Sequence, residues 1–237
     1  MTGIQTLHIT VPAHLRKSLA RGLARDAFAR APRAEGAVAR VLDMLGRTRP
    51  NLRNRRRGAL RLARVPGVVA CAIRADGFEM TLRVRREMIL CDDAGEQFRA
   101  DVLVYTQVRQ LQRRGNSEFL LRRVILSPHA VERLIQRSDC PLEGVLATAD
   151  AEAAQMFDAG ADLPSTPERA FRHALRAGVW AGSMDESLAD DGWPVDYRAE
   201  TDRRIPTFTA RTFLSPDEMD PVTWLHWQGD DRLAMTA

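Results

Sequence analysis

The stretch "FEMTLRVRREMILCD" (residues 78–92) decides what fold is expected for the middle of the chain. Apolar and polar side chains alternate along its centre, with the apolar ones at Met80, Leu82 and Val84. A period of two is typical of a half-buried strand, because successive side chains point to opposite faces of a sheet. Residues 78–92 are therefore predicted to form a β-strand.

The neighbouring segments extend this strand into a sheet. The "ADG" turn (75–77) separates it from an earlier apolar segment and places Asp-Gly where hairpins favour it. Two later segments, "FRADVLVYTQV" (98–108) and "FLLRRVILS" (119–127), are also rich in β-branched and aromatic residues. We predict an antiparallel sheet of about four strands over residues 65–127.

Helices are predicted before the sheet. Leu15, Leu19 and Leu23 recur at steps of four within residues 12–31, which lines up one face of a helix. A second helix is predicted over residues 33–45, before a glycine.

After the sheet, three Ser-Pro or Thr-Pro pairs mark helix starts, because the hydroxyl can cap free N–H groups and proline suits the first helical position. They begin at Ser127, Thr166 and Ser215. The helices predicted here cover residues 128–138, 142–158 and 167–177, and a short terminal helix starts at Pro216. The strands predicted here cover residues 178–184, 193–200 and 205–215.

This order of elements predicts an α+β fold. Three regions are expected: a basic helical region (1–64), an antiparallel sheet region (65–127), and a region of helices and short strands with an acidic carboxy-terminal segment (128–237). The last two regions are compatible with one continuous domain.

Charge is distributed unevenly along the chain, whose net charge is +4. Residues 1–64 hold fifteen Lys or Arg and three acids, whereas residues 185–237 hold five and twelve. This separation favours an acidic partner for the amino-terminal region, either a nucleic acid or an acidic protein such as an antitoxin. It is equally compatible with docking of the acidic end onto the basic end.

The arginines concentrate in "RPNLRNRRRGALRLAR" (residues 49–64). Clusters of this kind contact nucleic-acid phosphates without regard to base sequence. The segment contains no aromatic residue, so stacking on single-stranded bases is not indicated. A solvated linker, or a dock for the acidic segment, is the alternative. The residues predicted to contact phosphate here are Arg49, Arg53, Arg55, Arg56, Arg57, Arg61 and Arg64.

The composition indicates a cytoplasmic protein without a membrane partner. No apolar run approaches the roughly 20 residues of a membrane span, and the first ten residues lack the features of an export signal. The three cysteines are widely spaced and show no zinc-binding pattern. No cofactor and no metal site are expected.

The segment "SPHAVERLIQRS" (127–138) places His129, Arg133 and Arg137 at steps of four along one predicted helix, opposite an apolar face. An ordinary surface helix accounts for this pattern. In the alternative, His129 lies in the positively polarised first turn, where its pKa is lowered, and acts as a base while Arg133 holds a phosphate.

"LSPHAVERLIQRS" (126–138) resembles the H-A-x-x-R-x-x-x-R helix of small bacterial and phage proteins related to toxin nucleases of the RelE and barnase–EndoU–colicin type. The resemblance implies metal-independent RNA cleavage with a base, an acid and arginines around the phosphate. His129, Arg133 and Arg137 match the helix, and Arg211 with Thr212 would lie on the last strand. The chain departs from the pattern in about 120 residues before the motif and in its acidic tail.

Three functions remain open on this basis. The first is a toxin-like ribonuclease of a toxin–antitoxin system, with His129 transferring protons and with Arg133 and Arg211 stabilising the phosphorane. In that case Arg137 would add a nucleic-acid contact. The second is a non-enzymatic toxin that inhibits a replication, transcription or translation component. The third is an adaptor or antitoxin-type interaction protein.

Overall fold

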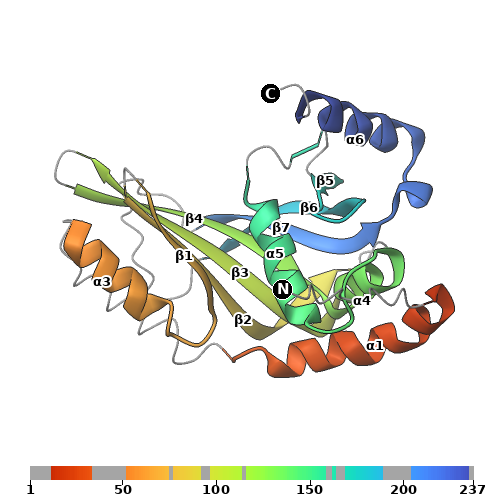
Figure 1. The fold of residues 1–237 in the computed structure, drawn as a ribbon, viewed down its shortest axis with the longest axis horizontal. Coiled ribbons are helices and arrows are strands. Elements are labelled where there is room, and N and C mark those ends of the chain that lie inside the picture. The colour runs from red at the N-terminus through yellow and green to blue at the C-terminus, as the bar shows by residue number, and fades with distance from the viewer. Residues whose placement is uncertain are drawn as a thin grey trace, which may run out of the picture.

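The computed structural model describes residues 12–33, 52–74, 77–91, 97–113, 116–158, 162–163, 169–188 and 204–234. Within them, one seven-stranded sheet runs in the order β1-β2-β3-β4-β7-β6-β5 (Figure 1). The strands are β1 (Val68–Arg74), β2 (Gly77–Cys91), β3 (Gln97–Arg113), β4 (Asn116–Leu126), β5 (Ala170–His173), β6 (Val179–Leu188) and β7 (Arg204–Leu214). The helices are α1 (Ala13–Arg30), α3 (Leu52–Leu62), α4 (Pro128–Arg137), α5 (Val145–Met156), the 3-10 turn η3 (Pro216–Glu218) and α6 (Pro221–Ala234).

The α+β class and the antiparallel sheet over residues 65–127 are confirmed. β1 to β4 pair antiparallel in chain order, and β2 pairs with β3 from Gly77↔Leu111 to Cys91↔Gln97. A parallel pairing of β4 with β7, from Arg123↔Thr207 to Leu126↔Ala210, adds the later strands to the same sheet.

The sheet has two apolar faces, which β3 shows by alternation. Leu103 and Tyr105 belong to a core covered by α1, α4 and α5, whereas Val102 and Val104 belong to a second core on the opposite face. The second face is covered at one end by α3, through Leu62.

α3 and α6 lie at opposite ends of the molecule (Figure 1). α6 packs its Trp227 against a third cluster that contains Phe171 and Val179 of β5 and β6. The residues of α6, the described helix of the acidic carboxy-terminal segment, are thus at the far end from the arginines of α3. Docking of these residues onto α3 within one chain is not what the structure shows.

The helix over residues 12–31 is confirmed as α1, but of its predicted leucine row only Leu23 packs against the core. The buried residues are Ala20, Ala24, Ala27 and Phe28, whereas Leu15 and Leu19 are each 43% exposed. Small side chains allow α1 to approach α4 closely, because the distance between packed helices depends on the residues at the contact.

The helix predicted over residues 167–177 is wrong where the structure describes it. Residues 170–173 form β5, antiparallel to β6, and residues 174–178 form a turn that contains Gly178 in a positive-φ conformation. Local capping chemistry was outweighed by strand pairing. The predicted elements at 33–45 and 193–200 lie outside the described residues, except for Arg33, which forms an isolated β-bridge with Arg85.

The terminal helix starts later than predicted. The capping box of Ser215 and Glu218 is present but encloses only the single turn η3. α6 begins at Pro221, and the Oδ1 atom of Asp220 accepts hydrogen bonds from the backbone N–H groups of Val222 (3.1 Å) and Thr223 (3.0 Å). The start of α6 is therefore marked by the Asp-Pro pair at 220–221, in which Asp220 caps the helix.

Candidate nucleic-acid interface

Most of the arginine-rich stretch 49–64 folds as the helix α3 rather than as a linker. Arginine and leucine are good helix formers, which offsets the cost of the interior glycine at Gly58. Leu62 is buried in the second core, and Ala59 packs against that core. The helix is therefore anchored on the sheet by one narrow apolar face.

The arginines of α3 gather mainly on the opposite face. On a helical wheel drawn at 100° per residue, Arg56 and Arg61 mark the two margins of an arc of about 140°. This arc also contains Arg53 and Arg57, and all four side chains are exposed. Arg55 falls on the side of Leu62 and is only half-exposed. Four of the five arginines within α3 thus form one basic face, which we call the α3 arginine face.

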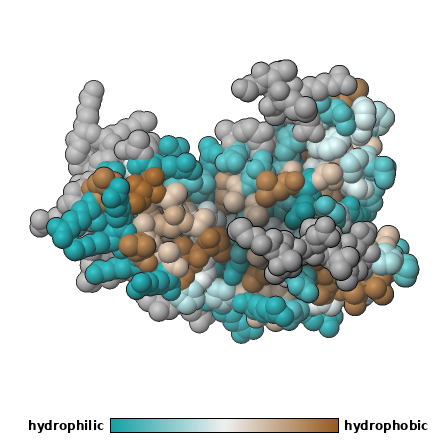
Figure 2. Space-filling view, viewed as in Figure 1, coloured by the Kyte–Doolittle hydropathy of each residue, from teal (hydrophilic) through white to brown (hydrophobic). Residues whose placement is uncertain are grey.

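The α3 arginine face is not neutralised by the rest of the described chain. No ion pair or hydrogen bond links its four guanidinium groups to the residues that the structure describes. α3 itself contains no acidic residue. Figure 2 shows hydrophilic surface along this helix, at the left of the molecule. Arg64 is exposed just beyond the helix, and Arg49 lies outside the described residues.

The second candidate feature is the start of α4. Ser127 caps this helix as predicted, because its Oγ accepts a hydrogen bond from the backbone N–H of Ala130 (3.1 Å). His129 is exposed in the first turn, and Nε of Arg133 donates to its Nε2 at 3.4 Å. Partial burial and then the charge of Arg133 hold the pKa of His129 below its ordinary value of 6.5. The structure therefore brings His129 and Arg133 together, with a neutral imidazole favoured.

The rest of the polar row on α4 is occupied by local partners. Arg133 also donates to Gln136 (2.9 Å), and Gln136 donates to Glu132 (2.9 Å). Glu132 in turn lies 3.9 Å from Arg21 of α1. Such a chain of surface contacts is what an ordinary amphipathic helix shows.

Arg137 serves the packing of α4 on β7. Its Nη1 donates to the backbone oxygen of Phe213 (2.7 Å) and to Oγ1 of Thr212 (3.3 Å), and its Nη2 pairs with Glu218 at 2.7 Å. The side chain is largely buried. The guanidinium predicted to contact nucleic acid is thus used within the fold.

Arg211 occupies a bulge in β7. Ala181 pairs with Thr212 and Gly182 pairs with Ala210, so Arg211 is the extra residue of β7 at this register shift, and it is exposed. Such bulges redirect a side chain away from the regular alternation. Arg211 is next to Thr212 in β7, and Arg137 at the carboxy-terminal end of α4 contacts Thr212. His129 lies at the other end of the same helix. Eight residues of helix separate the two ends by about 12 Å.

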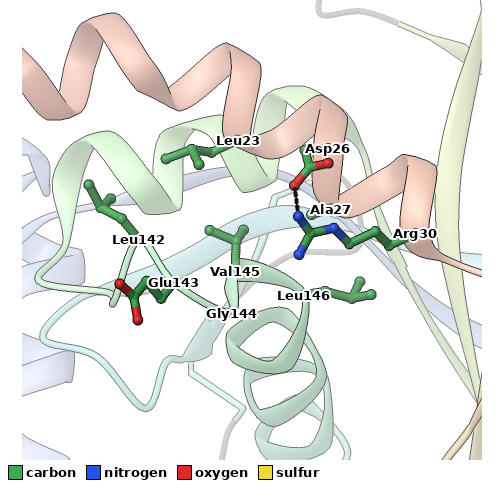
Figure 3. A pocket seen from close by; sticks show the side chains of 9 residues that line it. All are labelled: Leu23, Asp26, Ala27, Arg30, Leu142, Glu143, Gly144, Val145 and Leu146. Carbon is green, nitrogen blue, oxygen red and sulfur yellow. Dashed lines mark ion pairs between the residues drawn. The ribbon is translucent and has the colours of Figure 1, made fainter.

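Two pockets flank the amino-terminal end of α5, and sequence reasoning identified neither. The first, of about 300 Å³, lies between α1 and α5, and Asp26 and Arg30 on its α1 side pair at 2.6 Å (Figure 3). The second, of about 420 Å³, borders Glu152 and the turn at Leu175. Neither is lined by His129 or by the α3 arginine face.

Comparisons with known proteins give no family to which the chain can be assigned. No family model, no curated protein and no solved structure matches it. Among the described residues, no group of three or more His, Cys, Asp or Glu side chains is placed to hold a metal ion. None of the described helices is both long enough and apolar enough to cross a membrane.

Proposed function

We propose that the protein binds nucleic acid through phosphate contacts made by the α3 arginine face. One observation supports this above all: exposed guanidinium groups gather on one side of a helix whose other side is fixed to the sheet. Guanidinium groups form forked hydrogen bonds with phosphate oxygens. Because these groups have no acidic partner among the described residues, binding a polyanion breaks no ion pair within that part of the chain.

Replacing Arg56, Arg57 and Arg61 together by alanine is expected to weaken nucleic-acid binding about tenfold or more at 0.1 M salt. The reason is counterion release, which contributes about 0.9 to the slope of log K against log salt for each phosphate neutralised on duplex DNA. The slope should therefore fall by about 2.7 if each arginine contacts one phosphate. Fluorescence anisotropy at several salt concentrations measures both quantities.

A matched variant controls for net charge alone. Arg25, Arg30 and Arg99 are exposed arginines on α1 and β3, and their joint replacement by alanine removes the same total charge. This control should retain most of the slope. Equal losses in the two triple variants would contradict a specific role for α3.

A second candidate function is metal-independent RNA cleavage at the start of α4, supported by the contact between Arg133 and His129. A neutral imidazole beside a fixed cation can accept a proton while the cation holds the phosphate. Arg211 lies beside the opposite end of α4, so this second candidate rests on His129 and Arg133 alone.

If His129 acts as this base, His129→Ala should reduce RNA cleavage in EDTA about a hundredfold or more. The rate should rise with pH through a pKa below 6.5, and Arg133→Ala should move that pKa upward, because Arg133 holds it down. His226→Ala, at an exposed histidine of α6, is the control. Cleavage that persists in the His129→Ala variant would exclude this mechanism.

A further inference from the structure

We infer that α3 binds in the major groove of duplex DNA, with Leu60 against the base edges and the arginines against the backbones on either side. This inference rests on the proposed function and names the class of nucleic acid. It uses a feature that phosphate binding alone does not require, namely an exposed leucine within the α3 arginine face.

Leu60 is 67% exposed, whereas Leu62, two residues later, is 2% exposed. On the helical wheel Leu60 falls between Arg56 and Arg53, within the arc of about 140° that defines the basic face. An apolar side chain flanked by cations suits a surface with an apolar floor and anionic walls. The major groove has these properties, because thymine methyl groups line its floor and phosphates line its edges.

The dimensions of α3 fit the same groove. A helix with its side chains is about 10–12 Å across, and the major groove of B-DNA is about 12 Å wide. The eleven residues of α3 extend over about 16 Å. Arg56 and Arg61 lie at opposite margins of the arc, so each is directed toward a different wall of the groove.

Other forms of nucleic acid fit α3 less well. The major groove of A-form RNA is deep and too narrow for side chains to read, so a helix cannot place Leu60 against its bases. Single strands are held largely by stacking on aromatic rings, and α3 has no aromatic residue. The geometry therefore favours duplex DNA over both.

The position of α3 in the fold leaves its basic face accessible. α3 lies at one end of the sheet, away from α1, α4, α5 and α6 (Figure 1). Its contacts with the sheet come from the Leu62 side. A duplex can approach the opposite side without displacing a described element.

The test compares four probes of one 20-base-pair sequence by fluorescence anisotropy at fixed salt: the DNA duplex, the RNA duplex, a single DNA strand and a DNA duplex with uracil in place of thymine. The DNA duplex should bind about tenfold more tightly than the RNA duplex or the single strand. Removing the thymine methyl groups should weaken binding severalfold.

Leu60→Ala should weaken binding to the thymine-containing duplex about three- to tenfold, and have little effect on the uracil-containing duplex. Leu225→Ala, at a leucine of α6 that is 63% exposed, is the matched control and should change neither. Circular dichroism of Leu60→Ala checks that α3 remains folded.

Equal affinities for the DNA duplex, the RNA duplex and the single strand would overturn this inference, as would a Leu60→Ala variant with unchanged affinity. Both outcomes leave the phosphate-binding proposal standing if the Arg56, Arg57 and Arg61 variant still loses its salt slope. Failure of the proposed function appears instead as an unchanged slope in that triple variant.

Discussion

Replacing Glu152 by alanine should lower the free energy of unfolding by about 3–5 kcal/mol. Glu152 is fully buried in α5, and its carboxylate accepts hydrogen bonds from Nε1 of Trp180 (2.9 Å) and from the backbone N–H groups of Leu175 (3.0 Å) and Arg176 (3.2 Å). Each donor left without an acceptor costs about 1–3 kcal/mol where water cannot reach it. Trp180 is fully buried, so its indole N–H contributes most of the loss.

Urea denaturation of both proteins at pH 7 measures this difference. Glu143→Ala, at an exposed position just before α5, is the control and should change stability by less than about 0.5 kcal/mol. A loss below about 1 kcal/mol for Glu152→Ala would mean that the three donors find other partners.

The Glu152→Gln variant separates charge from hydrogen bonding. Oε2 accepts from both Trp180 and Leu175, so a glutamine oxygen placed there keeps two of the three bonds. Burial raises the pKa of Glu152 in the folded state above its ordinary value of 4.5. At a pH between the ordinary pKa and the raised pKa, the folded state therefore binds more protons than the unfolded state. The stability of the natural protein relative to the glutamine variant should therefore fall as pH rises above 4.5.

The sheet was predictable because its signal is local. Met80, Leu82 and Val84 are all buried, as their alternation indicated. The pairing of β4 with β7 was not predictable, since Arg123 and Thr207 are far apart in the sequence and no turn fixes their register. The same limit explains the error at 170–173, where pairing with β6 replaced a helix that the Thr166-Pro167 pair favoured.

The packing of α1 shows a second limit of sequence reasoning. A row of leucines and a row of alanines follow the same helix at nearly the same period, and only the leucines were used to define its predicted apolar face. The alanines are buried because α4 lies close to them, with Ala130 and Val131 in the same core. Residue size alone does not reveal which row meets a neighbouring helix.

For the candidate site, the sequence identified the arginine cluster but not its arrangement. Once residues 52–62 are known to be a helix, the wheel separates Arg55 from the arginines of the basic face and places Leu60 among them. The role of Arg137 was hidden for another reason: its partners, Thr212, Phe213 and Glu218, lie about 75–80 residues away in the sequence.

Asp150→Ala should destabilise the fold by about 3–5 kcal/mol, because it leaves a buried cation without its partner. Both carboxylate oxygens of Asp150 accept from Nη1 of Arg83 on β2, and Oδ1 also accepts from the hydroxyl of Tyr105 on β3 (2.9 Å). The Arg83 side chain is only 11% exposed, and Tyr105 is fully buried. The carboxylate thus ties α5 to two strands.

The exposed pair of Asp26 and Arg30 is the control for this prediction. Its atoms are 2.6 Å apart, but the side chains are 52% and 69% exposed, so Asp26→Ala should cost less than about 1 kcal/mol. The two single variants therefore separate the effect of burial from the effect of a short ion-pair distance.

A double variant distinguishes an unpaired charge from a lost attraction. Arg83→Met combined with Asp150→Ala removes both charges, so it should recover part of the stability lost by Asp150→Ala alone. Denaturant melts of the natural protein, Arg83→Met, Asp150→Ala and the double variant complete the cycle. If the double variant is as unstable as the sum of the singles, Asp150 acts through its packing and through Tyr105, and the charge of Arg83 is not the cause.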